Sequence, residues 1–126
     1  MTKDLEENNS GILITVKTEY LNEQNLSHNG RNFFSYTITI KNVGKEFVKL
    51  LTRHWIIIDA DGQKEEVLGE GVIGYFPELE PEQSFTYTSF CPLDTNWGTM
   101  EGTYKFIRRD GTMFEATIPR FYLHKD

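Results

Sequence analysis

The chain has 126 residues, a formal net charge of -6 and 38% hydrophobic residues. This length suits one domain with one core, and the acidic balance disfavours nucleic acids and anionic membranes as partners. Cys91 is the only cysteine, so an intramolecular disulfide is excluded. Because the polar start lacks the apolar segment of a signal peptide, we expect a cytoplasmic protein that does not associate with membranes.

The first ten residues differ in composition from the rest. Residues 1–10 are rich in Glu and Asn, which predicts a flexible tail, and residues 11–126 are expected to form a single domain. Apolar and polar residues then alternate over residues 12–17 and, most regularly, over residues 34–41. This period of two predicts strands with one face in a core and one in water.

A central strand is predicted over residues 47–59, which carry apolar side chains on both faces. Alternation places Arg53 and Trp55 on one face of this strand and His54 on the other. A metal or anion could then be held by His54 and Arg53 together only if the strand twists or bulges. The alternative is that His54 is a structural residue, hydrogen-bonded to a neighbour.

Two Asp-Gly pairs mark turns. Asp61-Gly62 predicts a two-residue hairpin, and Asp110-Gly111 predicts a second hairpin turn. Pro119 is expected to end the strand pairing that follows. Further strands are predicted over residues 83–90, 104–108, 114–118 and 121–123.

The predicted fold is all-β, with seven to eight antiparallel strands and no segment of helical periodicity. Short strands separated by turns favour an immunoglobulin-like β-sandwich, and the fibronectin type III-like form needs no disulfide. A barrel is the alternative, because strand number alone does not separate the two.

Residues 69–74, here called the glycine loop, carry the spacing Gly69-x-Gly71-x-x-Gly74. A dinucleotide site would need a helix directly afterwards, but Tyr75-Phe76-Pro77 follows instead. Two interpretations stay open. Backbone amides of the loop, together with Arg53, could bind phosphate or pyrophosphate, or the glycines could serve backbone shape alone.

Other candidate sites are weaker. Tyr75, Phe76 and Trp97 fall in predicted loops, where they could anchor a partner or close the ends of the sandwich. The acidic residues Asp59, Asp61, Glu65 and Glu66 surround a turn without the spacing of a metal site. No catalytic motif is present, and we predict no catalytic residue, no metal and no cofactor.

Several segments resemble the ApaG family, in order over residues 12–124. They are Tyr36-Thr37-Ile38-Thr39-Ile40, Arg53-His54-Trp55, Val67-x-Gly69-x-Gly71-Val72-x-Gly74, Gly98-Thr99-Met100-Glu101-Gly102 and Ile118-Pro119-x-Phe121. One departure is Pro81-Glu82, where many relatives have Pro-Gly. The resemblance implies a fibronectin type III-like sandwich in a bacterial cytosolic protein.

The resemblance also implies a function whose link to cation transport is indirect. Bacterial members are associated with cobalt tolerance, magnesium efflux and a chromosomal neighbourhood that includes a dinucleoside tetraphosphate hydrolase. Eukaryotic relatives, in an F-box protein and a polymerase-interacting protein, look like protein-binding modules. We therefore expect a non-enzymatic module, monomeric or weakly dimeric, that binds a protein partner or a small anion such as pyrophosphate or a nucleotide. An enzyme of nucleotide or pyrophosphate metabolism is the alternative.

Overall fold

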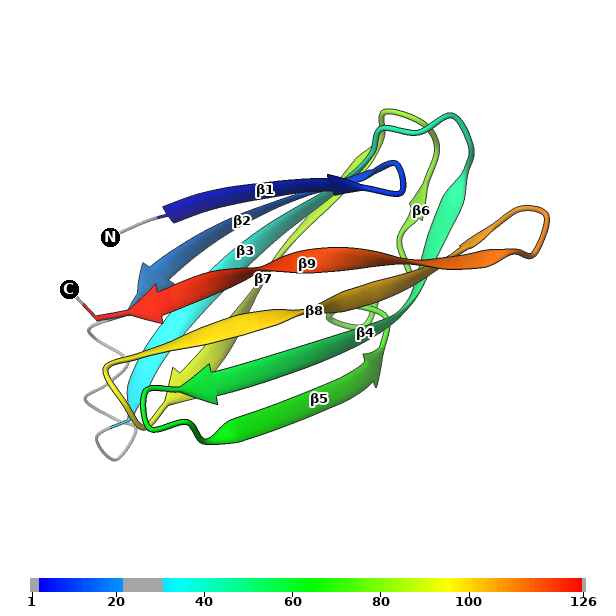
Figure 1. Ribbon diagram of the computed structural model, residues 1–126. Coiled ribbons are helices and arrows are strands. Elements are labelled where there is room, and N and C mark those ends of the chain that lie inside the picture. The colour runs from blue at the N-terminus through cyan, green and yellow to red at the C-terminus, as the bar shows by residue number, and fades with distance from the viewer. Residues whose placement is uncertain (1–2, 22–30, 126) are drawn as a thin grey trace.

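The computed structural model describes residues 3–21 and 31–125, with side chains described from residue 10 onward within these ranges. The described residues form strands and no helix (Figure 1). The strands are β1 (Lys3–Asn9), β2 (Ile12–Tyr20), β3 (Asn32–Asn42), β4 (Val48–Asp59), β5 (Lys64–Glu70), β6 (Glu78–Leu79), β7 (Ser84–Leu93), β8 (Trp97–Arg108) and β9 (Met113–His124). No helix that could cross a membrane occurs in this part of the chain.

Two antiparallel sheets pack face to face. One has the order β1-β2-β3-β7 and the other β5-β4-β8-β9, with the short β6 paired to the start of β4. Because β9 contacts β1 and β2, the free edges of β5 and β7 lie on the same side of the molecule (Figure 1). The predicted fibronectin type III-like sandwich is confirmed, and the two sheets keep separate edges rather than closing into a barrel.

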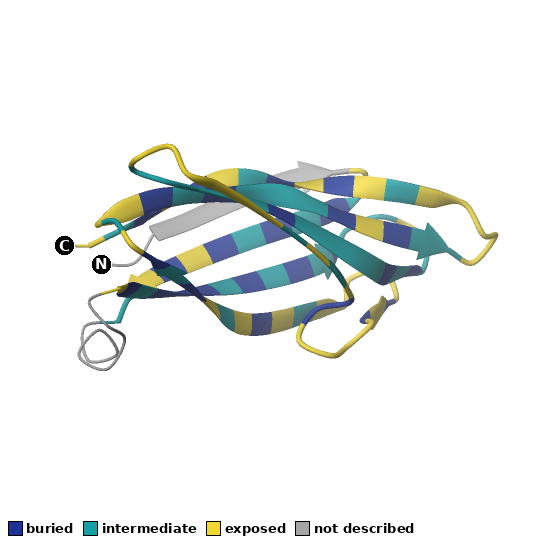
Figure 2. Cartoon of the chain, turned by 90° about the horizontal axis from the view of Figure 1, so that it is seen from below, coloured by how far each residue is buried: buried dark blue, intermediate teal, exposed yellow. Residues whose placement is uncertain are grey.

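The core lies between the sheets and is built from alternate residues of each strand, as the banding of buried residues in Figure 2 shows. On β3 the inward side chains include Phe34 and Tyr36, and Trp55 of β4 packs edge-on against Tyr36 and Phe121, at 5.4 and 5.9 Å between ring centroids. Burial of each such side chain stabilises the fold by about 1.5–3 kcal/mol. The predicted alternation over residues 34–41 is confirmed.

One β-bulge shapes β4, and a second corrects the prediction made for Pro119. In β4 the register against β8 shifts between Leu50 and Thr52, so Leu50 and Trp55 are both buried although they are five positions apart, an odd offset that regular alternation would place on opposite faces. In β9, Pro119 does not end the pairing. The register shifts near Glu101, and pairing resumes beyond Pro119, because a bulge accommodates a residue that has no amide to donate.

Two other predictions differ from the structure. Residues 3–9, expected to belong to a flexible tail, form β1 antiparallel to β2, because backbone pairing at a sheet edge needs no apolar side chains; residues 1–2 lie outside the described residues. The turn at Asp61-Gly62 has three residues rather than two. The Asp59 amide donates to Gln63 O and the Gly62 amide donates to Asp59 O, both at 3.0 Å.

Candidate functional site

The glycine loop folds into a miniature hairpin. Val72 and Tyr75 exchange two backbone hydrogen bonds of 2.9 Å each. The turn between them consists of Ile73 and Gly74, with φ of +41° and +84°. Two successive residues with positive φ are typical of a type I′ turn. Gly74 suits that conformation, whereas a β-branched residue such as Ile73 rarely adopts it.

The amides of this loop are largely engaged within the protein. The Gly71 amide donates to Leu51 O at 2.9 Å, the Val72 amide donates to Tyr75 O, and the Tyr75 amide donates to Val72 O. Gly71 has φ of +63°, and a Cβ there would overlap the carbonyl oxygen of Tyr75. These contacts favour the interpretation that the glycines serve backbone shape, and they leave few amides for a phosphate.

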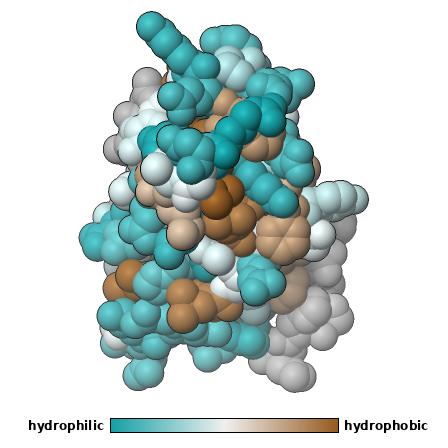
Figure 3. Space-filling view, turned by 90° about the vertical axis from the view of Figure 1, so that its right-hand side faces the viewer, coloured by the Kyte–Doolittle hydropathy of each residue, from teal (hydrophilic) through white to brown (hydrophobic). Residues whose placement is uncertain are grey.

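Three apolar side chains beside the glycine turn form an exposed group, here called the loop patch. Ile73, Tyr75 and Phe76 are 49%, 60% and 45% exposed. Two of them are held from one side: the Tyr75 ring contacts Phe85 at 5.8 Å, and Lys49 Nζ lies 6.0 Å from the Phe76 ring centroid. Figure 3 views the end of the molecule that carries the loop and shows hydrophobic atoms exposed amid a hydrophilic surface.

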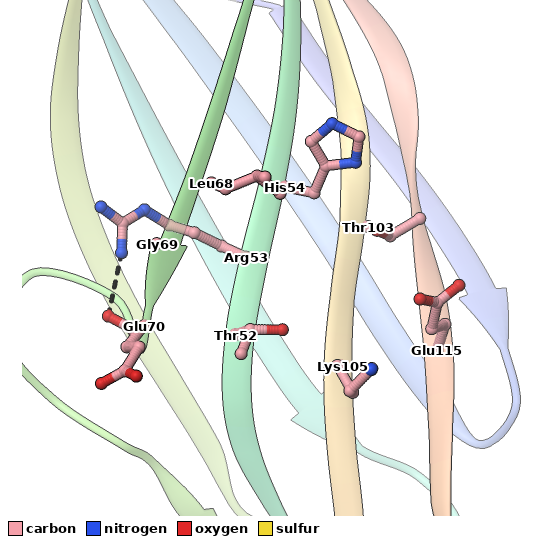
Figure 4. Close-up of a pocket in the computed structure, with 9 residues that line it drawn as sticks. All are labelled: Thr52, Arg53, His54, Leu68, Gly69, Glu70, Thr103, Lys105 and Glu115. Atoms are coloured by element: carbon pink, nitrogen blue, oxygen red, sulfur yellow. Dashed lines mark hydrogen bonds between the residues drawn. The ribbon is translucent and has the colours of Figure 1, made fainter.

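Arg53 braces the glycine loop from β4. Its Nη1 donates to Glu70 O at 3.0 Å and to Gly71 O at 2.8 Å. The guanidinium lies flat against Gly69, where any Cβ would come within 2.6 Å of Arg53 Cζ. Figure 4 shows this side chain running across β5 toward Glu70. The loop thus offers carbonyl oxygens to Arg53, and Gly69 supplies the space for its side chain.

His54 points to the opposite face, as predicted by alternation (Figure 4). It lies on the outer surface of the sheet, where its Nε2 is 3.0 Å from Glu66 Oε1. This contact is the first cause of the lowered pKa of the Glu66 carboxyl. A hollow of about 430 Å³ beside it is bordered by Lys105 and Glu115. Arg53 and Gly69 also border this hollow. The Arg53 guanidinium is directed away from His54, toward Glu70 (Figure 4), so the two side chains do not converge on one ligand.

The remaining acidic and thiol groups have local roles. The Asp59 carboxylate accepts the amides of Asp61 and Gln63, at 2.9 and 3.0 Å, and so shapes its turn. Cys91 is buried, and burial raises the pKa of its thiol to about 12. Within residues 3–21 and 31–125, no three His, Cys, Asp or Glu side chains gather where they could hold a metal ion.

The predicted partner residues do not form one surface. Glu70, in the glycine loop, pairs with Thr52 in the first half of β4, whereas Gly98, next to Trp97, pairs with Asp59 at the end of β4. Tyr75 and Trp97 therefore lie toward opposite ends of the sandwich. The Trp97 ring, 46% exposed, stacks on Tyr122 at 6.5 Å between centroids.

A second cavity went unrecognised in the sequence. It has a volume of about 350 Å³, opens between the free edges of β5 and β7, and is here called the edge cleft. Its polar lining comes from Arg31, Tyr36, Arg53, Glu65 and Ser89. Alternation places the strand residues inward, but only the order of strands in the two sheets brings β5 and β7 together, and no local pattern encodes that order.

Comparisons with known proteins agree over most of the chain. The family model of the ApaG domain matches residues 22–108. Protein ApaG of Anaeromyxobacter dehalogenans (strain 2CP-C) is 49% identical over 113 residues, covering 90% of this chain and 89% of that protein. Protein ApaG of Bdellovibrio bacteriovorus is 46% identical and covers 87% of each chain. A crystal structure from Bordetella pertussis, 40% identical, superposes with a TM-score of 0.85 over 90% of this chain and 92% of that one.

Proposed function

This chain belongs to the ApaG domain family, and we propose that it is a non-enzymatic binding module that recognises a protein partner through the loop patch. The observation that carries the proposal is Ile73, a β-branched residue held at φ +41° with an apolar side chain 49% exposed. Such a conformation costs about 1–3 kcal/mol and clusters at functional sites.

The chemistry of the patch suits protein recognition. Aromatic side chains dominate the binding energy of protein interfaces, and ordering them before binding lowers the entropic cost. Tyr75 and Phe76 are ordered by Phe85 and Lys49, and the loop beneath them is braced by Arg53. The patch is therefore apolar, exposed and supported from one side in the unbound protein.

What supports binding rather than catalysis is that the reactive groups have other roles. A thiol with a pKa of about 12 at Cys91 supplies almost no thiolate nucleophile at neutral pH. His54 is engaged with Glu66 on the outer face. In this proposal, any part in cobalt tolerance or magnesium efflux is indirect and follows from regulation of the protein partner.

Capture of partners by the immobilised chain tests the proposal. The variant Tyr75→Ser/Phe76→Ser removes the aromatic half of the patch, and Trp97→Ser removes an aromatic of similar exposure at the other end. We expect partners retained by the wild type and by Trp97→Ser to be depleted at least about tenfold on the double variant, since paired hot-spot residues contribute more than 1 kcal/mol each. Circular dichroism and urea unfolding verify that both variants are folded.

Two outcomes would overturn the proposal. The first is an identical set of partners, at unchanged yield, on the wild type and on the folded double variant. The second is metal-dependent turnover of pyrophosphate or diadenosine tetraphosphate that is abolished by His54→Ala or by Asp59→Ala. The second outcome would establish the enzyme alternative in place of a binding module.

A further inference from the structure

The edge cleft has an unusual feature, which is a guanidinium without a carboxylate partner. Arg53 uses Nη1 to donate to two carbonyl oxygens, and no ion pair involves it among the described residues. Its Nε and Nη2 have no acceptor within the same part of the chain. Since guanidinium presents several donors in a planar fork, this arrangement leaves donors available to an outside oxyanion.

The neighbouring groups in the cleft are also donors. The pKa of the Tyr36 phenol is raised by burial, an effect that its hydrogen bond with Ser89 opposes, so the phenol remains protonated at neutral pH. Ser89 contributes a hydroxyl, and the Cys91 thiol is neutral. Arg31 lines the same cavity, with its Nε 2.8 Å from Asp94 Oδ1.

One lining group opposes an anion. Glu65 of β5 lies opposite Ile57 in the register and lines the cleft with an exposed side chain. The charged lining is therefore two arginines against one glutamate, on a chain whose formal net charge is -6. Arg31 is already paired with Asp94, so Arg53 is the cation available to a ligand and Glu65 is the group that limits its affinity.

We propose that the edge cleft binds a small oxyanion, a carboxylate or phosphate group, held by the free donors of Arg53 with the hydroxyls of Tyr36 and Ser89. A volume of about 350 Å³ suits a small ligand of this kind. The site differs from an amide nest in the glycine loop, because its donors are side chains of β3, β4 and β7, and the Gly71 and Val72 amides of the loop are already engaged within the protein.

Glu65→Gln is the variant that tests the site most directly. Removing the opposing carboxylate should tighten binding of an oxyanion by about fivefold, the effect expected for one charge at several ångströms in a partly solvated site. Glu66→Gln is the matched control, because it changes the net charge equally but lies on the outer face beside His54. It should leave the affinity within about twofold. Neither variant alters the loop patch, so the outcome is independent of the partner proposal.

The measurement is a titration of the full chain, labelled with ¹⁵N, by pyrophosphate, inorganic phosphate and glutarate at constant ionic strength. We expect saturable shifts of the backbone amides of Arg53, Ser89 and Cys91 with at least one probe. Saturation by both phosphate probes but not by glutarate identifies a phosphate site, and the reverse identifies a carboxylate site. Ser89→Ala, which removes one hydroxyl at the cleft, should weaken binding by about threefold to tenfold.

Three outcomes would overturn the inference. In the first, none of the probes shifts these amides at 10 mM, which is about the weakest affinity a built site should show. In the second, Glu65→Gln and Glu66→Gln tighten binding equally, which would show long-range attraction rather than a site. In the third, the saturable shifts fall on Gly71 to Gly74 and not on the cleft, which would restore the amide nest of the glycine loop.

Discussion

Two kinds of turn in this sandwich reverse the chain with different residues at the positions of positive φ. The β4–β5 and β8–β9 hairpins each place glycine at the residue with positive φ, Gly62 at +84° and Gly111 at +90°. Each also has an aspartate that accepts turn amides, Asp59 in the first and Asp110 in the second. The glycine loop instead places Ile73 at φ +41° and exposes its side chain.

The difference distinguishes turns that stabilise the fold from a turn that exposes apolar side chains to solvent. Aspartate and glycine satisfy the backbone of a hairpin without strain. An isoleucine in the left-handed region raises the energy of the folded state, and it is retained only where the surrounding structure fixes the conformation. Around Ile73, that structure consists of the Val72–Tyr75 hydrogen bonds and the brace from Arg53. Stability is therefore reduced at the glycine loop, where apolar side chains face solvent.

The largest effect that sharpens this comparison is expected for glycine replacement. Gly71→Ala should lower the free energy of unfolding by about 3 kcal/mol, because the new Cβ meets the Tyr75 carbonyl and φ is positive. Gly62→Ala, where nothing lies within 4 Å, should cost only about 1 kcal/mol. Urea unfolding of both variants measures the difference. Equal losses would show that the glycine loop is no more constrained than an ordinary turn.

An intermediate effect, a gain rather than a loss of stability, is expected when the backbone strain at Ile73 is relieved. Ile73→Gly should raise the free energy of unfolding by about 0.5–1 kcal/mol, the left-handed penalty of isoleucine less the added chain entropy of glycine. Glu82 is the natural control, because it too is a non-glycine residue with positive φ, +75°. Glu82→Gly should stabilise by a similar amount in the same urea experiment.

Ile73→Gly and Glu82→Gly are then expected to differ in their effect on partner capture. Ile73→Gly is expected to weaken capture of the protein partner, because it deletes a side chain of the loop patch, and Glu82→Gly is expected to leave capture unchanged. An Ile73→Gly variant that is less stable than the wild type would show that the positive φ of Ile73 is not a source of strain. Equal partner capture by both variants would remove Ile73 from the binding surface.

Local patterns in the sequence predicted the elements that are determined locally. The alternation through Phe34 and Tyr36 gave the inward face of β3, because burial on one side of a sheet requires a period of two. The same rule placed Arg53 and His54 on opposite faces of β4. The spacing of strands and turns favoured a sandwich, the family resemblance implied the same fold, and the structure confirms it.

What the sequence could not predict depends on neighbouring strands. Bulges at Leu50 and Pro119 are set by the register against β8, and β1 exists because the edge of β2 accepts its backbone. The edge cleft needs Glu65 and Ser89, from different sheets, to line one cavity. Such contacts between distant segments follow from strand order, which no single strand encodes.

The smallest effect is a dependence of stability on acidic pH, and it distinguishes the β8–β9 turn from the β4–β5 turn. The Asp110 carboxylate accepts the amide of Thr112 at 2.9 Å and its hydroxyl at 2.7 Å. The backbone bond first and the hydroxyl second lower the pKa of Asp110 in the folded chain. A carboxyl with a depressed folded pKa stabilises the protein above its unfolded pKa, about 3.9, and this contribution is lost as the pH falls through the folded value.

Asp110→Asn should therefore lower the thermal midpoint slightly at pH 6, and the difference from the wild type should shrink as the pH falls below about 4. Asp61→Asn is the control at the equivalent place in the other turn, where the neighbouring Asp59 carboxylate accepts the turn amides instead. Asp61→Asn removes an equal charge without removing the acceptor of the turn amides, so it is the baseline against which Asp110→Asn is compared. Thermal unfolding of the three proteins between pH 6 and pH 3 measures both differences. A gap between Asp110→Asn and the wild type that is constant over this range would mean that the Thr112 contacts do not bind the charged carboxylate more strongly than the neutral group.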